Sequence, residues 1–366
     1  MEQNPLNLLA AGGTGGHLFP AEALGVELMK RGLRVRLATD ARALRYSGLF
    51  SRDTIDVVPS ETVRSRNPLS LARTAFTLAA GMAVATHLLW KLKPAAVVGF
   101  GGYPTLPPLL AAKLLRIPSV IHDANAVLGR ANRFLSNHVS AIATSLPGVL
   151  DRDPQLASKT TVVGTPMRPA IVAAAAVKYA TPEVGGPMRL LITGGSQGAR
   201  VMADIVPGAI EKLDPSLWRR LLLTQQVREE DMTRVRAVYD RLKINAELAP
   251  FFADLPARLA ANHLVISRSG AGTVSELAAI GRPSILVPLP GAIDQDQFAN
   301  AGVLSEAGGA LRLPQSEFTP ERLASEISAL AADPAKLANM AKAARNAGRL
   351  DAAERLADLV VKVAGI

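Results

Sequence analysis

The stretch Arg268-Ser269-Gly270-Ala271-Gly272-Thr273-Val274-Ser275-Glu276 decides the fold, because it joins two elements of different kinds. It follows the apolar run 264–266, which predicts a buried strand, and precedes the run 277–280, which predicts a helix. Gly270 and Gly272 lack a Cβ, so backbone amides can approach a ligand closely at the positive end of the helix dipole. The loop therefore suits a nucleotide or a diphosphate. A local alternative is a capping box formed by Thr273 and Glu276, which would only satisfy the first helix amides.

Three other glycine-rich stretches repeat this arrangement. Each follows an apolar run: Gly12-Gly13-Thr14-Gly15-Gly16-His17, Gly101-Gly102-Tyr103-Pro104-Thr105, and Gly194-Gly195-Ser196-Gln197-Gly198-Ala199-Arg200. Four such loops place several helix N-termini around shared crevices at the carboxyl ends of parallel strands. The sequence therefore predicts an α/β fold with two doubly wound, Rossmann-like domains that face one another across a cleft.

The length of 366 residues exceeds that of one ordinary core, which agrees with two domains. We expect an N-terminal domain over residues 1–168 and a C-terminal domain over 169–349, with turn-forming residues at 164–169 marking the boundary. The final helix, within 350–366, is expected to return to the first domain. The chain has no cysteine and shows no secretory signal pattern, so we expect a cytoplasmic location.

The formal net charge of +10 calls for an acidic partner. Nucleic acid is not expected, because the basic residues are scattered and no helix-turn-helix, zinc-finger or aromatic RNA-binding signature occurs. Residues 71–90 form the least polar stretch, and their spacing favours an amphipathic helix over a membrane-spanning one. Basic residues at its ends suit an anionic membrane surface. The alternative is a helix packed on the sheet, and both hold if Phe76 or Trp90 projects outward.

Polar residues in the glycine loops are candidates for chemistry. His17 opens a helix, where the dipole disfavours the imidazolium, so a neutral ring that acts as general base on an alcohol is possible; simple packing is the alternative. Ser196 and the amides of residues 195–198 are candidates for holding a phosphate, although Ser196 also suits a helix N-cap. Glu276 has two oxygens that can accept both hydroxyls of a ribose.

Other kinds of site receive little support from the sequence. Asp151-Arg152-Asp153 has the pattern of a turn and Asp294-Gln295-Asp296 that of a helix start, and neither has a partner cluster for metal coordination. We therefore expect no metal site and no cofactor. No nucleophile elbow, Walker lysine or His-Glu-x-x-His motif occurs. The glycine spacing at 12–16 does not match the dinucleotide fingerprint, and only Asp40 keeps a dehydrogenase as an alternative.

Taken together and in this order, the motifs 12–17, 101–103, 194–199 and 268–276 resemble the peptidoglycan N-acetylglucosaminyltransferases that make lipid II. The resemblance covers nearly the whole chain. It implies a GT-B type fold and inverting transfer of N-acetylglucosamine from UDP-N-acetylglucosamine to the 4-hydroxyl of undecaprenyl-pyrophosphoryl-N-acetylmuramyl-pentapeptide (lipid I). It also implies a peripheral protein at the cytoplasmic face of the plasma membrane, metal-independent chemistry and possible partners among cell-wall synthesis proteins.

The resemblance also implies site residues. Glu276 would bind the ribose, the backbone of Phe252 the uracil and Gln297 the sugar, and the other donor contacts would come from Thr14, Gly15, Gly16, Asn125, Arg168, Ser196, Ala271, Gly272, Thr273, Val274 and Ser275. Two stretches depart from the family pattern: Asp296 replaces a glutamine of some members, and His122-Asp123-Ala124-Asn125 replaces the more usual His-Glu-Gln-Asn. His17 is the expected base and Asp123 its competitor.

Two alternatives remain from the sequence. A UDP-N-acetylglucosamine 2-epimerase shares the two-domain fold and the donor, but it has no use for an apolar helix with basic ends. A non-catalytic UDP-sugar-binding or membrane scaffold protein would keep Glu276 but has no reason to place His17 in the cleft.

Overall fold

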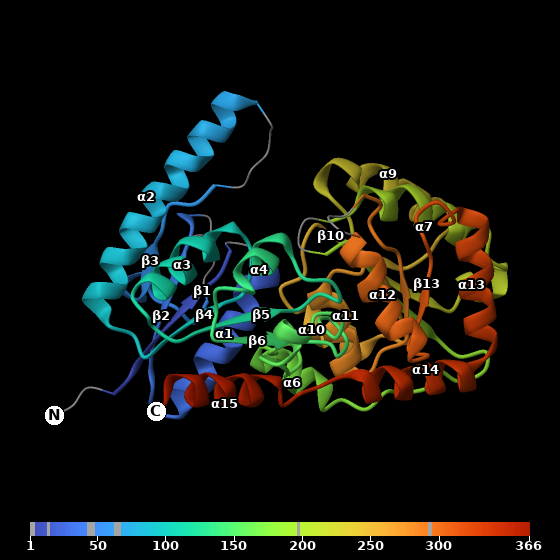
Figure 1. Cartoon of the computed structure of the whole chain (residues 1–366). Coiled ribbons are helices and arrows are strands. Elements are labelled where there is room, and N and C mark those ends of the chain that lie inside the picture. Colours follow the sequence, from blue (N-terminus) through green and yellow to red (C-terminus); the bar gives the residue numbers. More distant parts are fainter. Residues whose placement is uncertain (1–3, 13–14, 42–47, 62–66, 196–197, 292–294) are drawn as a thin grey trace. The chain divides into compact units, whose positions relative to one another are not determined.

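A computed structural model describes residues 4–12, 15–41, 48–61, 67–195, 198–291 and 295–366, with the backbone alone at 68–71 (Figure 1). The chain divides into two compact units. Unit 1 consists of Met1–Arg168 together with Leu350–Ile366, and unit 2 consists of Pro169–Arg349. Each unit has its own parallel sheet and its own core.

The sheet of unit 1 has seven parallel strands in the order β3-β2-β1-β4-β5-β6-β7. The strands are β1 (Leu6–Ala10), β2 (Arg34–Thr39), β3 (Ile55–Val57), β4 (Ala96–Gly99), β5 (Ser119–Asp123), β6 (Ala141–Thr144) and β7 (Thr160–Val162). The helices are α1 (Gly15–Lys30), α2 (Pro68–Leu92), α3 (Leu106–Leu114), α4 (Arg130–Leu135), α5 (Pro154–Ala157) and α15 (Ala352–Ala364), with 3₁₀ turns η2 (Arg52–Thr54) and η3 (Tyr103–Thr105). Strands β1, β4 and β6 are buried throughout, as expected for a parallel sheet that helices cover on both faces.

The C-terminal helix belongs to this first unit. Leu356 and Val360 of α15 are fully buried in one core with Leu24 of α1. At the helix surface, Arg31 Nη1 donates to Asp358 Oδ1 at 2.7 Å, which ties the end of α1 to α15. The last helix of the chain therefore completes the core that the first helix begins.

The sheet of unit 2 has six parallel strands in the order β10-β9-β8-β11-β12-β13. The strands are β8 (Met188–Thr193), β9 (Leu221–Gln226), β10 (Ala246–Ala249), β11 (Leu264–Ser267), β12 (Ser284–Leu286) and β13 (Ala310–Arg312). The helices are α6 (Pro169–Ala175), α7 (Arg200–Glu211), α8 (Pro215–Trp218), α9 (Met232–Arg241), α10 (Leu255–Ala261), α11 (Ala271–Ile280), α12 (Asp296–Glu306), α13 (Pro320–Ala332) and α14 (Pro334–Ala347), with a 3₁₀ turn η4 (Glu229–Asp231).

Strand order reverses once in each sheet, between β1 and β4 and between β8 and β11. The four predicted glycine loops follow these four strands. Ala10 pairs with Gly99 and Ser267 with Thr193, so the two loops of each pair start at the same level of the sheet. Such reversal points are where open α/β sheets bind ligands. The prediction of two doubly wound, Rossmann-like folds is confirmed.

Several elements differ from the sequence prediction. Edge strands β10 and β13 were not predicted, because they are only four and three residues long and one directly follows Gly308-Gly309. The C-terminal tail is helical, with a break between α14 and α15. Gly348 lies in this break, where a Cβ would come within 2.5 Å of the Ala278 carbonyl oxygen, so close packing fixes a glycine there.

Helix α2 has apolar residues on both its buried and its exposed sides. Ala85 and Leu89 are buried in the unit 1 core with residues of α3, whereas Phe76 and Trp90 are 78% and 66% exposed. Gly81, which the sequence pattern assigned to the polar side, is buried. The segment Ala72–Leu92 is long and apolar enough to cross a membrane. Only 17% of its most apolar 18-residue stretch is buried inside the protein. Helix α2 is therefore packed on the unit 1 core through one side and exposes Phe76 and Trp90 on another, while its membrane contact stays a prediction.

We expect Gly81→Ala to destabilise the protein. Alanine normally stabilises a helix interior by about 1 kcal/mol relative to glycine. Here the added Cβ would overlap the carbonyl oxygen of Pro59, so α2 or the segment after β3 must shift, at a cost of about 1–3 kcal/mol. The midpoint of thermal unfolding should fall. The exposed Ala83→Gly in the same helix is the control and reports propensity alone. A rise in the midpoint for Gly81→Ala would contradict the packing argument.

Candidate active site

His17 lies in the first turns of α1 and is fixed by a backbone carbonyl. Its Nδ1 lies 2.8 Å from Phe100 O. A carbonyl oxygen only accepts hydrogen bonds, so Nδ1 carries the proton and Nε2 is the nitrogen that can accept one. A Cβ at Gly12 or Gly101 would come within 3.2 or 3.3 Å of the imidazole ring, and Gly101 has a φ of +92°. The glycine loops of unit 1 therefore form a close-fitting seat for this ring.

Asp123, the competing candidate base, is saturated with hydrogen bonds. Its Oδ1 accepts from Asn125 N at 3.0 Å and from Asn125 Nδ2 at 3.1 Å. Its Oδ2 accepts from Gly129 N and from Asn132 Nδ2, both at 2.9 Å. The side chain is only 3% exposed. This carboxylate is engaged in shaping the segment that carries Asn125, and it is poorly placed to take a proton from a substrate.

Other predicted residues of unit 1 occupy different environments. Gly15 is buried and Gly16 exposed at the start of α1, whereas Thr14 is outside the described residues. The guanidinium carbon of Arg168 lies 3.7 Å from the centre of the Phe19 ring. His122, which precedes Asp123, is a core residue: its Nε2 lies 2.9 Å from Gly164 O, and burial lowers the pKa of the ring.

The loop after β8 uses two of its amides within the protein. Gly195 N donates to Thr193 Oγ1 at 3.3 Å, and Gly198 N donates to Gly195 O at 3.1 Å. These two amides therefore stabilise the turn itself, and the expectation that the loop also holds a phosphate stays a prediction. A Cβ at Gly194 would overlap the amide nitrogen of Ala199, so the turn requires glycine. Ser196 is outside the described residues.

Helix α11 starts three residues earlier than the capping-box alternative requires. Its N-cap is Gly270, without a side-chain hydrogen bond to the helix, and its first residue is Ala271. Thr273 and Glu276 lie inside the helix, so the capping-box interpretation is wrong. No described atom lies within 4 Å of a Cβ built at Gly270 or Gly272. The amides at this helix N-terminus are therefore open to a close approach.

The residues beneath this helix start form a hydrogen-bonded support. Arg268 Nη1 donates to Val287 O and Pro288 O, both at 3.1 Å, and burial lowers the pKa of this guanidinium. Ser269 Oγ donates to Gln297 O at 2.8 Å. These bonds join the loops after β11 and β12 to α12, which begins at Asp296.

Gln297 and Phe252, both predicted to contact the donor, have clear structural partners as well. Gln297 Oε1 accepts from Leu289 N at 3.0 Å, so part of this amide already holds the loop after β12. The side chain of Phe252 is buried, and the guanidinium carbon of Arg258 lies 4.3 Å from its ring centre. A buried ring leaves the backbone of Phe252 as the part that can face a ligand.

The Asp-x-Asp patterns do not build a metal site among the described residues. Asp153 caps α5, where Oδ1 accepts from Gln155 N and Leu156 N at 3.1 Å each. Asp296 is the first residue of α12, and Asp294 is outside the described residues. Across the ranges given above, no group of three or more His, Cys, Asp or Glu side chains could hold a metal ion.

Comparison with known protein families first defines the class of enzyme. Residues 8–144 match the glycosyltransferase family 28 N-terminal domain, and residues 189–356 match the glycosyltransferase family 28 C-terminal domain. The chain is thus a hexosyltransferase of the two-domain glycosyltransferase type.

The relatives then define the family. One relative, from Bradyrhizobium sp. strain BTAi1, is 79% identical over 362 residues and covers 99% of both chains. Another, from Bradyrhizobium diazoefficiens, is 77% identical over 366 residues and 100% of both chains. Both are named UDP-N-acetylglucosamine–N-acetylmuramyl-(pentapeptide) pyrophosphoryl-undecaprenol N-acetylglucosamine transferase. The chain belongs to this family of transferases.

Solved structures agree with this assignment. MurG of Acinetobacter baumannii matches with a TM-score of 0.78 and 29% identity, over 98% of this chain and 99% of that one. The UDP-N-acetylglucosamine 2-epimerase of Neisseria meningitidis matches with a TM-score of 0.66 over 98% of this chain and 99% of that one. Its identity of 15% shows a shared fold alone.

Proposed function

We propose that this protein transfers N-acetylglucosamine from UDP-N-acetylglucosamine to the 4-hydroxyl of the muramyl sugar of lipid I, which forms lipid II. The family membership supports the reaction. The observation that carries the mechanism is the bond from His17 Nδ1 to Phe100 O, because it makes Nε2 the nitrogen that can accept a proton, at the start of α1 and at the reversal point of the first sheet. Unit 1 would then bind the acceptor and unit 2 the UDP-sugar.

The proposed reaction is a single in-line displacement. The acceptor oxygen attacks the anomeric carbon, its proton passes to His17 Nε2, and the bond from the anomeric carbon to the diphosphate oxygen breaks with its electron pair left on UDP. The open N-terminus of α11 favours this developing negative charge. We assign Glu276 to the ribose, Gln297 to the sugar and the backbone of Phe252 to the uracil. Asp123 would position Asn125.

A product assay tests the reaction. The purified protein is mixed with UDP-N-acetylglucosamine and a short-chain lipid I analogue in EDTA, and UDP release and products are followed. We expect a β-1,4-linked disaccharide lipid that forms only with the acceptor, at a rate that EDTA does not change. UDP-N-acetylmannosamine or UDP formed without acceptor would instead support the epimerase alternative, and UDP binding without turnover would support a scaffold.

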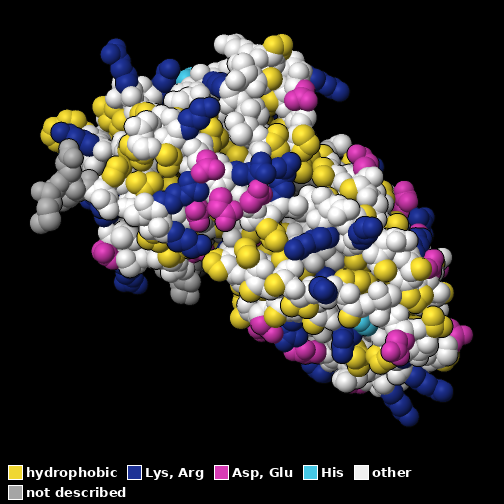
Figure 2. Space-filling model, turned by 90° about the horizontal axis from the view of Figure 1, so that it is seen from below, with side chains coloured by type: hydrophobic (Ala, Val, Ile, Leu, Met, Phe, Trp, Pro, Cys, Tyr) yellow, Lys and Arg dark blue, Asp and Glu magenta, His cyan; other side chains and the backbone are white. Residues whose placement is uncertain are grey.

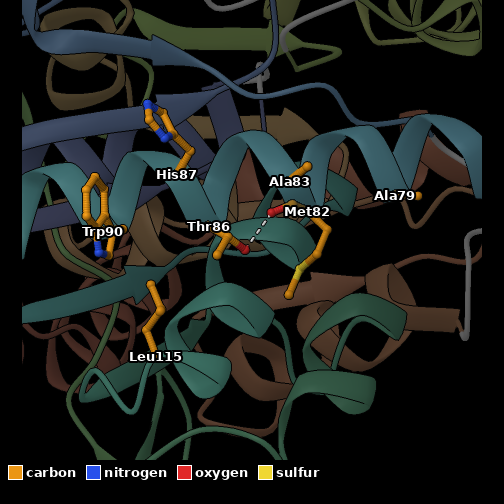
Figure 3. A pocket seen from close by; sticks show the side chains of 7 residues that line it. All are labelled: Ala79, Met82, Ala83, Thr86, His87, Trp90 and Leu115. Atoms are coloured by element: carbon orange, nitrogen blue, oxygen red, sulfur yellow. Dashed lines mark hydrogen bonds between the residues drawn. The ribbon is translucent and has the colours of Figure 1, made fainter.

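We further propose that the outward side of α2 rests on an anionic membrane at the cytoplasmic face. Phe76 and Trp90 project from the helix, and Lys91 and Lys93 are exposed at its end. An apolar pocket of ≈ 550 Å³ lies on this helix, away from the glycine loops. Figure 3 shows Met82 and Thr86 pointing from α2 toward Leu115, while His87 points away. Membrane contact would cover these apolar surfaces, and the lysines would face lipid headgroups.

Charge elsewhere on the surface is mixed. Figure 2 shows Lys and Arg side chains interspersed with Asp and Glu over the face that it presents. This view contains no single basic stripe of the kind that nucleic-acid-binding proteins present. Partners among cell-wall synthesis proteins remain a prediction from the family resemblance.

We expect the double variant Phe76→Ser, Trp90→Ser to lose membrane binding. Burial of each large apolar side chain contributes about 1.5–3 kcal/mol, so the partition coefficient should fall by about tenfold or more. Co-sedimentation with phosphatidylglycerol vesicles at low salt measures the effect. Leu222→Ser, at a partly exposed position in unit 2, is the control and should bind like the parent. Parental binding by the double variant would refute the role of α2.

A further inference from the structure

Gln226, the last residue of β9, connects two loops of unit 2 through one buried amide. Its Oε1 accepts from Thr193 Oγ1 at 2.9 Å and from Gly194 N at 3.0 Å. Its Nε2 donates to Pro250 O at 3.1 Å. The side chain is only 7% exposed. One side chain therefore joins the glycine loop after β8 to the segment between β10 and α10.

We propose that Gln226 is a positioning residue for the donor nucleotide, which sets the separation between the loop for the diphosphate and the segment for the base. This inference rests on the proposed function, in which the backbone of Phe252 faces the uracil, and on the prediction from the sequence that the glycine loop after β8 holds a phosphate of the donor. A nucleoside diphosphate spans both segments, whereas a nucleoside reaches only the second. Gln226 touches neither part of the ligand, so its effect must pass through the loops.

The position requires a side chain that accepts hydrogen bonds at one end and donates one at the other, which a glutamine amide does. The oxygen takes two donors and the nitrogen supplies one donor to a carbonyl. Glutamate would keep the bonds to Thr193 and Gly194 but would direct an oxygen at Pro250 O. Methionine, of similar length, would make none of the three bonds.

Thr193 extends the connection into the glycine loop. Its hydroxyl donates to Gln226 and accepts from Gly195 N, so the shape of the turn depends on the same side chain. Gly195 has a φ of +82°, and the turn at Gly194 leaves no room for a Cβ. The loop is therefore held from beneath by Thr193 and Gln226 together.

The neighbouring Gln225 provides a matched control. It is fully buried on the other side of β9, where its Oε1 accepts from Tyr239 Oη at 2.5 Å and its Nε2 donates to Met202 O at 3.4 Å. These partners belong to α9 and α7, not to the two loops. Substitution of either glutamine by methionine thus removes buried hydrogen bonds, but only substitution of Gln226 breaks the connection between the two loops.

The experiment compares UDP and uridine binding by calorimetry in the full-length parent and in Gln226→Met, Gln226→Glu, Thr193→Val and Gln225→Met. We expect Gln226→Met to bind UDP about 10–30-fold more weakly, since the three buried hydrogen bonds that it loses contribute about 0.5–1.5 kcal/mol each. Uridine affinity should change less than threefold. In turnover, KM for UDP-N-acetylglucosamine should rise while kcat and KM for the acceptor stay within threefold.

Gln226→Glu and Thr193→Val each keep part of the connection and should fall between the parent and Gln226→Met, which guards against a variant that fails to fold. Gln225→Met should keep the parental ratio of UDP to uridine affinity. Parental UDP affinity in Gln226→Met, or an equal loss of UDP and uridine affinity, would overturn the inference. Failure of the parent to bind UDP would overturn the proposed function instead.

Discussion

Replacing His17 by alanine is expected to lower kcat by about 10²–10⁴-fold, the range for loss of a general base. Its Nδ1 bonds to Phe100 O and therefore carries a proton, so Nε2 is the ring nitrogen that can take the proton of the acceptor hydroxyl. KM for UDP-N-acetylglucosamine should change little, because the residues assigned to the ribose, the sugar and the uracil belong to unit 2. Initial rates with saturating donor and a lipid I analogue measure the effect. The acid limb of the pH–rate profile should disappear with the imidazole.

Asp123→Asn is the comparison that separates the base from the residue that positions the loop. The asparagine nitrogen would face amide donors, so the segment from Asn125 to Gly129 should loosen and kcat should fall. The shape of the pH–rate profile should remain, because His17 is intact. If Asp123→Asn abolishes the acid limb while His17→Ala preserves it, the assignment of the base must be reversed.

Replacing Glu276 by alanine is expected to raise KM for UDP-N-acetylglucosamine by about 10–10²-fold. A carboxylate that accepts from both ribose hydroxyls makes two charge-assisted hydrogen bonds, each of about 1.5–3 kcal/mol, and water replaces part of this energy. The most specific measurement is the ratio of the affinities for UDP and 2′-deoxy-UDP. The parent should bind UDP more tightly, and Glu276→Ala should bind both nucleotides about equally. Competition binding measures this ratio directly.

Two further variants sharpen the Glu276 test. Glu276→Gln keeps one acceptor oxygen and should show an intermediate loss. Glu211→Ala removes an exposed carboxylate that pairs with Arg241 at 2.8 Å, and it should leave both nucleotides unaffected. A Glu276→Ala protein that still discriminates against 2′-deoxy-UDP would show that another group binds the ribose.

Local sequence patterns predicted the parts of the fold that depend on neighbouring residues. Glycine loops after apolar runs located the strand ends at both reversal points, since a tight turn needs glycine wherever a Cβ would overlap the backbone, as at Gly194. Local patterns left two interpretations open for Thr273 and Glu276, because their spacing fits a capping box as well as the interior of a helix that starts earlier. Only the position of the helix start separates the two.

The supporting side chains were missed because their partners are distant in sequence. Gln226 bonds to residues 193 and 194 on the neighbouring strand, and no local pattern distinguishes it from Gln225, which points to the other side. The buried side of helix α2 was hard to predict for another reason. Both of its sides are apolar, so the periodicity of the sequence did not show that Gly81 is buried and Ala75 exposed. For a supporting residue such as Gln226, the sequence signal would be two polar residues at the end of a strand next to a strand that leads into a glycine loop.

The return of α15 to unit 1 has a practical consequence for dissecting the protein. Unit 2 is one uninterrupted piece of chain, Pro169–Arg349, and can be cut out at two points, whereas Met1–Arg168 alone lacks Leu356 and Val360 of its core. Removing residues 350–366 is therefore damage to the N-terminal core and not the trimming of a tail. A fragment that carries the first unit needs its C-terminal helix supplied, either as a separate peptide or by joining the natural ends through circular permutation.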